Sequence, residues 1–208
     1  DAEYMAQLQE SIRNAVDAVC GGASLPQKPG HAHGEYAWDV SASTIGFIFG
    51  REWESCAVKS FNERMNREFA DYQGRFLRML EASPFERWAV EQCDYLQAYE
   101  HEKYGITHLV SATNWPTLDP LVHLSESTYQ DELARQGSNL RTEACNENED
   151  AESLDLSKVV SMGGAGFFVT YHAYPYYPDF MNNDYLQQEN TYRAYLNLLK
   201  DHHAGQPL

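Results

Sequence analysis

Three short strand-like runs, each followed along the chain by a segment with helical spacing, constrain the fold of this 208-residue sequence most. The runs cover residues 45–50, 107–112 and 166–171. Continuous apolar runs of this length are typical of buried parallel strands, and strands that alternate with helices indicate parallel β/α units. We therefore expect the three runs to lie side by side as parallel strands of a single α/β domain that covers residues 1–208.

Helices are predicted where apolar residues recur at intervals of three to four. The best-marked helix starts at Ser83-Pro84, because Ser83 can cap it, Pro84 fits its first position and Glu86 completes a capping box. The predicted helices cover residues 2–19, 61–80, 84–103 and 184–203, with a short helix near 127–136.

An acidic segment at residues 137–157 has little apolar surface to bury, which predicts a flexible loop outside the functional site. The whole chain is acidic as well, with 15 Lys and Arg against 31 Asp and Glu and a net charge of −16. Nucleic acids and anionic membranes need a basic face, so the charge argues against both as partners. The sequence has no apolar run of membrane-spanning length, and we expect no transmembrane segment.

The four cysteines form no C-x-x-C pair, which excludes a zinc ribbon and a thioredoxin motif. We interpret them mostly as buried thiols; the alternative, one or two disulfide bonds, would place the chain in an exported protein. Among possible metal ligands, His31 and His33 with Glu35 stand in a loop rich in Gly and Pro, and no metalloprotease or calcium-loop pattern supports them. We predict neither a metal nor a cofactor.

Functional side chains are expected at the carboxyl ends of the predicted strands, where parallel sheets bind ligands. The first run leads into Arg51-Glu52-Trp53-Glu54. A carboxyl group beside Trp53 at the mouth of a strand suits a general acid, so Glu52 is the catalytic candidate and Glu54 its rival. The alternative is that either glutamate forms a surface ion pair.

The second run ends in Asn114-Trp115 and the third in His172-Ala173-Tyr174, followed by Tyr176. Asn114 can bind a substrate hydroxyl, and Trp115 can stack on a sugar ring. His172 and Tyr174 share a face of an extended strand and can hydrogen-bond a catalytic carboxylate. The alternatives are that Asn114 caps the turn with Trp115 packed under the loop, and that His172 is a core residue. The high aromatic content, with 14 Tyr, 9 Phe and 4 Trp, fits either a stacking groove or an ordinary core.

These strand ends resemble a known family. Residues 46–53, Gly-Phe-Ile-Phe-Gly-Arg-Glu-Trp, resemble the fourth strand of (β/α)8 glycoside hydrolases of the retaining cellulase-like superfamily, in which a Gly-Asn-Glu type motif carries the acid/base Glu. Arg51 stands where that family has Asn. Residues 113–120 and 171–180 are similar to strands five and six of an uncharacterised bacterial branch of such barrel proteins.

The resemblance covers most of the chain and implies an incomplete TIM-type barrel, with strands four to six and their flanking helices. It implies a glycoside hydrolase-like protein that acts on or binds a carbohydrate, with Glu52 as general acid/base. Arg51, Trp53, Asn114, Trp115, His172, Tyr174 and Tyr176 would contact the substrate. The nucleophilic Glu of a retaining enzyme would follow the seventh strand, outside this sequence.

Two other interpretations stay open. In one, the chain is a carbohydrate-binding or scaffold protein without catalytic activity. In the other, it is a self-contained α/β domain with an unrelated ligand. If the barrel is incomplete, its open sheet edges predict association with the remaining strands or with a second copy, because unpaired strand edges bind other strands.

Overall fold

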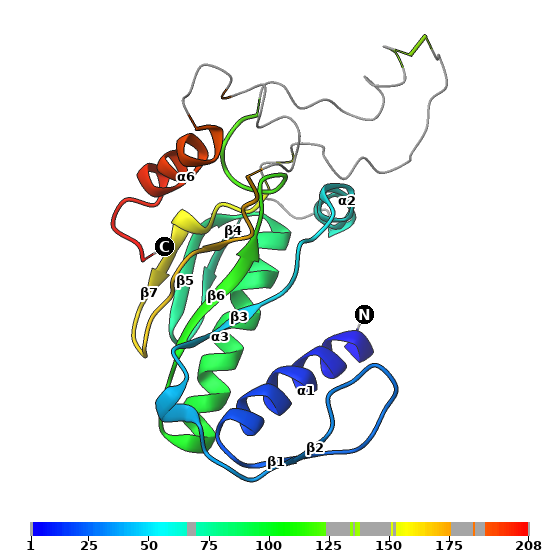
Figure 1. The fold of residues 1–208 in the computed structure, drawn as a ribbon, viewed down its shortest axis with the longest axis vertical. Coiled ribbons are helices and arrows are strands. Elements are labelled where there is room, and N and C mark those ends of the chain that lie inside the picture. Colours follow the sequence, from blue (N-terminus) through cyan, green and yellow to red (C-terminus); the bar gives the residue numbers. More distant parts are fainter. Residues whose placement is uncertain are drawn as a thin grey trace.

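The computed structural model describes residues 2–65, 70–123, 134, 136–137, 151, 153–175, 185 and 190–207. Figure 1 shows the path of the chain. The helices are α1 (Ala2–Val19), η1 (Ser41–Ser43), α2 (Ser55–Met65), α3 (Pro84–Tyr104), η2 (Leu156–Lys158) and α6 (Thr191–His202). The strands are β1 (Ala23–Leu25), β2 (Gly34–Tyr36), β3 (Gly46–Phe49), β4 (Ala70–Gln73), β5 (Leu77–Ala82), β6 (Leu109–Asn114), β7 (Val159–Ser161) and β8 (Thr170–Tyr171).

The three strand-like runs form one parallel sheet in the order β3-β6-β8. Phe47 lies opposite Val110 in the first pair, and Asn114 lies opposite Tyr171 in the second. Strand β8 is short, but a parallel bridge between Val110 and Phe167 extends the contact toward the start of that run. The prediction of three neighbouring parallel strands is therefore confirmed.

The prediction of a TIM-type barrel is wrong. A (β/α)8 barrel alternates one parallel strand with one helix, whereas here α2, the antiparallel strands β4 and β5, and α3 all lie between β3 and β6. Strand β7 then joins β5 to complete a separate antiparallel sheet, β4-β5-β7, and β1 pairs with β2 in a small antiparallel ribbon. The fold is mixed α/β, so the assignment to barrel strands four to six, and the nucleophile on a seventh strand, no longer apply.

The predicted helix over 61–80 is also wrong, because α2 ends at Met65 and the antiparallel hairpin β4-β5 follows from residue 70. Side chains of β5 point alternately to the two faces of the sheet, as in any strand. Leu77 and Met79 on one face are buried, while Leu80 on the other is 44% exposed. The turn of the hairpin is held from α3, since the backbone N–H groups of Phe76 and Leu77 donate to Asp94 Oδ1 at 2.7 and 2.8 Å.

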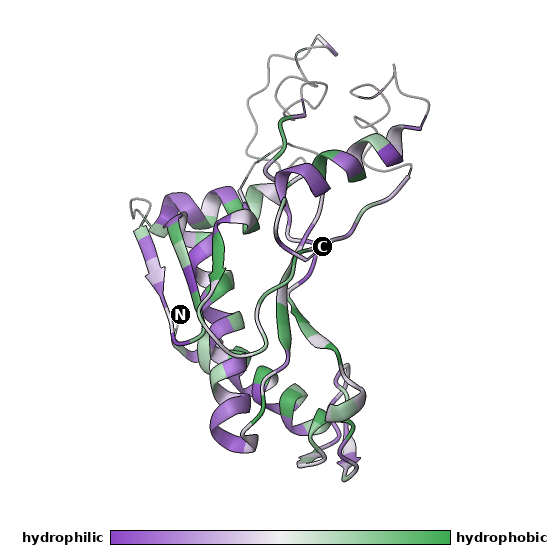
Figure 2. Cartoon of the chain, turned by 90° about the vertical axis from the view of Figure 1, so that its left-hand side faces the viewer, coloured by the Kyte–Doolittle hydropathy of each residue, from purple (hydrophilic) through white to green (hydrophobic). Residues whose placement is uncertain are grey.

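Helix α3 begins as predicted. The backbone N–H of Glu86 donates to Ser83 Oγ at 3.2 Å, and the N–H of Ser83 donates to Glu86 Oε2 at 2.7 Å. The helix ends at Gly105, whose φ of 72° is a left-handed conformation that glycine adopts without strain. It packs against both three-stranded sheets, and Figure 2 shows the hydrophobic strands lying along it. Most buried apolar side chains belong to one cluster around α3, and a smaller cluster around Tyr195 and Leu199 lies on α6.

Other predicted segments are described only in part. The short helix near 127–136 lies outside the described residues except for residues 134 and 136, and so do residues 184 and 186–189 of the last predicted helix. Of the acidic segment 137–157, residues 138–150 and 152 lie outside the described residues. Its last residues pack against the core: Leu154 is 1% exposed, and Asp155 Oδ1 accepts hydrogen bonds from Ser157 and His202.

The cysteines differ in state. Cys93 is a buried free thiol whose pKa is raised by burial, and burial raises the pKa of the free thiol of Cys20 to about 11. Cys56 is disulfide-bonded, and Cys145 lies outside the described residues. No helix in the described part of the chain has the length and apolar character needed to cross a membrane.

Candidate functional site

Glu52 lies just beyond the carboxyl end of β3, after a turn at Gly50, whose φ of 98° favours glycine. Its carboxylate oxygen Oε1 accepts a hydrogen bond from the hydroxyl of Tyr174 at 2.5 Å and one from His172 Nδ1 at 2.9 Å. The structure thus joins the two outer strands of the parallel sheet across the end of β6. We call Glu52, His172 and Tyr174 the carboxylate cluster.

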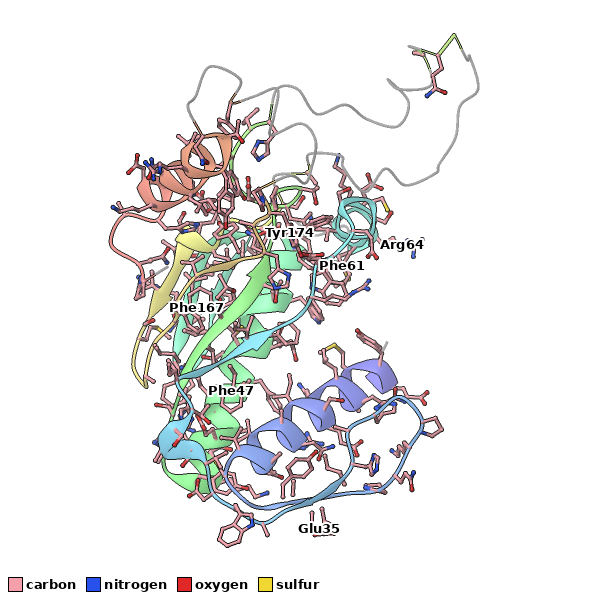
Figure 3. All side chains as sticks on the ribbon, viewed as in Figure 1. Glu35, Phe47, Phe61, Arg64, Phe167 and Tyr174 are labelled. Carbon is pink, nitrogen blue, oxygen red and sulfur yellow. The ribbon has the colours of Figure 1, made fainter. Side chains whose placement is uncertain are left out.

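The backbone places both donors of the carboxylate cluster. The N–H of His172 donates to the carbonyl oxygen of Asn114 at 2.8 Å, which continues the pairing of β6 with β8 by one residue. Residues two apart on an extended strand share a face, so His172 and Tyr174 both face Glu52. Figure 3 shows Tyr174 at the end of the sheet next to α2. The cluster is open to solvent, since the side chains of Glu52 and His172 are 34% and 45% exposed.

Asn114 and Trp115 are buried under the end of the sheet. The Asn114 side chain donates to the carbonyl oxygen of Leu154 at 2.8 Å and accepts from the N–H of Trp115 at 2.9 Å. Trp115 is 4% exposed, and its indole N–H donates to the carbonyl oxygen of Trp53 at 2.9 Å. Asn114 therefore caps the turn and Trp115 packs beneath the loop. Both residues are buried at the strand ends, and neither lines the solvent-exposed side of the carboxylate cluster.

Arg51 and Trp53 flank Glu52 in sequence but interact elsewhere. The guanidinium of Arg51 forms an ion pair with Glu54 at 2.8 Å and lies 4.9 Å from the centroid of the Trp53 ring. The Trp53 ring packs edge to face against Trp88 on α3, with centroids 5.5 Å apart. Arg51 thus neutralises Glu54 and not Glu52, which makes Glu54 a surface ion-pair residue. Tyr176 lies outside the described residues.

Sequence reasoning missed two buried polar networks. In the first, Tyr195 on α6 donates to Asp119 Oδ2 at 2.6 Å, and His123 Nε2 lies 3.3 Å from the same oxygen. Burial raises the pKa of Tyr195, so its hydroxyl stays a donor. In the second, His108 contacts the buried carboxylate of Glu100 and the carbonyl oxygen of Ser41. No motif marks either network; the four-residue spacing of Asp119 and His123 is the one local hint.

None of these groups forms a metal site of the usual kind. The part of the chain that the structure describes has no group of three or more His, Cys, Asp and Glu side chains arranged to hold a metal ion. Glu35 lies on β2, where it accepts a hydrogen bond from Ser24 Oγ of the paired strand β1 at 2.5 Å. In the loop between these strands, His33 Nδ1 lies 3.4 Å from the carbonyl oxygen of His31. The chemistry that the carboxylate cluster can perform is proton transfer, by a carboxyl group held by two donors at an open strand end.

Comparison with known proteins adds no relative: no family model, no curated protein and no solved structure matches this chain. The likeness to glycoside hydrolases therefore depends on the strand-end motifs alone.

Proposed function

We propose that Glu52 is the general acid/base of a site that acts on carbohydrate, as in glycoside hydrolase-like proteins. One observation carries the proposal: both hydrogen bonds to Glu52 fall on Oε1, and no described residue donates to Oε2. Two donors on one oxygen fix the orientation of the carboxyl group. The second oxygen is then available to exchange a proton with a bound ligand.

The chemistry suits the cleavage of a glycosidic bond, which begins with protonation of the leaving oxygen by a carboxylic acid. In this proposal Glu52 touches the reacting atoms, whereas His172 and Tyr174 are positioning residues. Sugars are neutral, so the net charge of −16 does not repel them. Residues 46–53 resemble the strand that carries the acid/base Glu of that family in sequence only, because the fold here is not a barrel, so the proposal depends on the hydrogen bonds to Glu52.

The test compares Glu52→Gln with Glu54→Gln in assays of the purified protein on a panel of aryl glycosides. Glutamine keeps the shape of the side chain but cannot donate an acidic proton, so turnover should fall about 10²–10⁴-fold in Glu52→Gln. Glu54→Gln removes an exposed ion pair, whose contribution to stability is about 0–1 kcal/mol, and should retain turnover within a few-fold. Equal turnover in wild type and Glu52→Gln would rule out the acid/base role.

The second candidate function is carbohydrate binding without turnover. It is favoured because glycosidases use a pair of carboxyl groups, and among the described residues no second carboxylate is hydrogen-bonded within the carboxylate cluster. Titrations of the same sugars followed by NMR would distinguish the two. Shifts at His172 and Tyr174 with no turnover by the wild-type protein would favour the binding function.

A further inference from the structure

A cavity of about 460 Å³ lies among the first turn of α1, α2 and α3. Aromatic side chains from all three helices and from Trp53 form its wall, and we call it the aromatic cavity. The side chains that matter here are Tyr4, Trp53, Phe61, Phe85, Trp88 and Glu91; Phe61 is labelled on α2 in Figure 3. Glu52, His172 and Tyr174 are not among the lining residues, so this cavity is separate from the carboxylate cluster.

The rings around the aromatic cavity pack edge to face. Trp53 lies at 82° to Trp88 and at 75° to Phe85, with centroid distances of 5.5 and 6.0 Å. Phe61 lies at 81° to Phe85, with the centroids 6.0 Å apart. One of these rings already accommodates a cation, since the guanidinium of Arg51 lies over the Trp53 ring at 4.9 Å from its centroid. The face of an aromatic ring carries partial negative charge, which attracts a cation.

Glu91 supplies the formal charge of the wall, because the other lining side chains are aromatic or aliphatic. No hydrogen bond or ion pair joins Glu91 to another described residue. Arg87, one helical turn earlier on α3, does not line the aromatic cavity, but it lines a smaller neighbouring hollow of about 100 Å³ together with Glu91. The formal charge among the lining side chains of the aromatic cavity is therefore negative, as is the net charge of −16 for the whole chain.

We infer that the aromatic cavity binds an organic cation with an apolar body, of the substituted-ammonium class. The apolar groups of the guest would be buried against the rings, and its charge would lie between the ring faces and the carboxylate of Glu91. The cavity has the size of an ordinary small-molecule site, about 300–1,000 Å³. A weakly hydrated ammonium fits better than an inorganic ion, since the wall offers one carboxylate and no cluster of oxygen ligands.

The experiment compares choline with 3,3-dimethylbutan-1-ol, a neutral isostere in which carbon replaces nitrogen. Each is titrated into the full chain, and the indole N–H signals of Trp53 and Trp88 are followed by NMR. We expect choline to shift both signals, and the alcohol to bind roughly tenfold more weakly, because it lacks the attraction of a charge to the ring faces and the carboxylate. Equal affinity for the two compounds, or unchanged indole signals, would overturn the inference.

Two variants and two controls then test the source of the selectivity. Glu91→Gln should weaken choline binding about two- to tenfold and leave binding of the alcohol unchanged. Phe61→Leu should do the same, since it keeps an apolar wall but removes a ring. Glu63→Gln is the matched control, because Glu63 is exposed on α2 outside the cavity; a loss as large as that of Glu91→Gln would contradict a specific site. Glu52→Gln should bind choline as the wild type does, because this inference does not depend on the proposed function.

Discussion

Among single residues, His108 shows most clearly how the fold sets an ionisation state. Its Nε2 lies 2.9 Å from the carbonyl oxygen of Ser41, and its Nδ1 faces the buried carboxylate of Glu100. Because both partners are acceptors, the ring satisfies both when it is protonated on both nitrogens. Burial acts to lower the pKa of His108, but the hydrogen bonds to Glu100 and Ser41 outweigh it and leave that pKa raised.

The raised pKa predicts how stability depends on pH. A group with a raised folded pKa contributes stability that is fully present below its unfolded pKa, about 6.5 for His, and that is lost as the pH rises through the folded value. The free energy of unfolding lost in His108→Gln should therefore be larger at about pH 6 than at about pH 8.5. Urea denaturation at both pH values measures it. His31→Gln, in the exposed loop, is the control; a His108→Gln effect independent of pH would contradict the assignment.

Among the elements, α3 depends on its capping box. Ser83→Ala removes the Oγ acceptor of the Glu86 N–H and leaves that buried group unpaired. We expect a loss of about 1 kcal/mol in the free energy of unfolding, measured by chemical denaturation. Ser60→Ala on α2 is the comparison, since no described residue accepts or donates a hydrogen bond at its hydroxyl, and it should be close to neutral. Equal effects of the two substitutions would show that the cap contributes nothing.

The elements that sequence reasoning located are those whose pattern is local. The box at Ser83 marks the start of α3, and the three apolar runs mark the parallel sheet. Because parallel strands end at one edge of a sheet, the sequence also predicted that Glu52, His172 and Tyr174 lie close together. In the structure, His172 and Tyr174 both hydrogen-bond to the carboxylate of Glu52.

The elements that sequence reasoning missed depend on partners far along the chain. Apolar residues three to four apart at 61–80 predicted a helix. In the structure, residues 70–82 form a hairpin whose turn is hydrogen-bonded to Asp94 of α3. The sequence also suggested that Asn114 binds a ligand. In the structure Asn114 is buried, and its side chain donates to the carbonyl oxygen of Leu154, forty residues later. No local spacing carries that information, because a side chain is exposed or buried according to what packs over it.

The described part of the molecule has two unequal cores. The larger one surrounds α3, which contacts both three-stranded sheets, whereas the smaller one lies under α6 around Tyr195 and Leu199. A small apolar cluster contributes little burial, so α6 also depends on hydrogen bonds, among them those from Tyr195 to Asp119 and between His202 and Asp155. We therefore expect α6 to open as a unit without unfolding of the larger core.

Tyr195→Phe tests this division. The substitution keeps the ring and removes the hydroxyl, which leaves the buried carboxylate of Asp119 without one of its donors at a cost of about 1–3 kcal/mol. Native-state hydrogen exchange should show amide protection in α6 reduced by roughly tenfold or more, with protection in α3 unchanged. Tyr192→Phe, one turn earlier on α6, removes a hydroxyl that forms no hydrogen bond with a described residue and should leave both helices unchanged. Equal loss of protection in α3 and α6 would mean that the two cores unfold together.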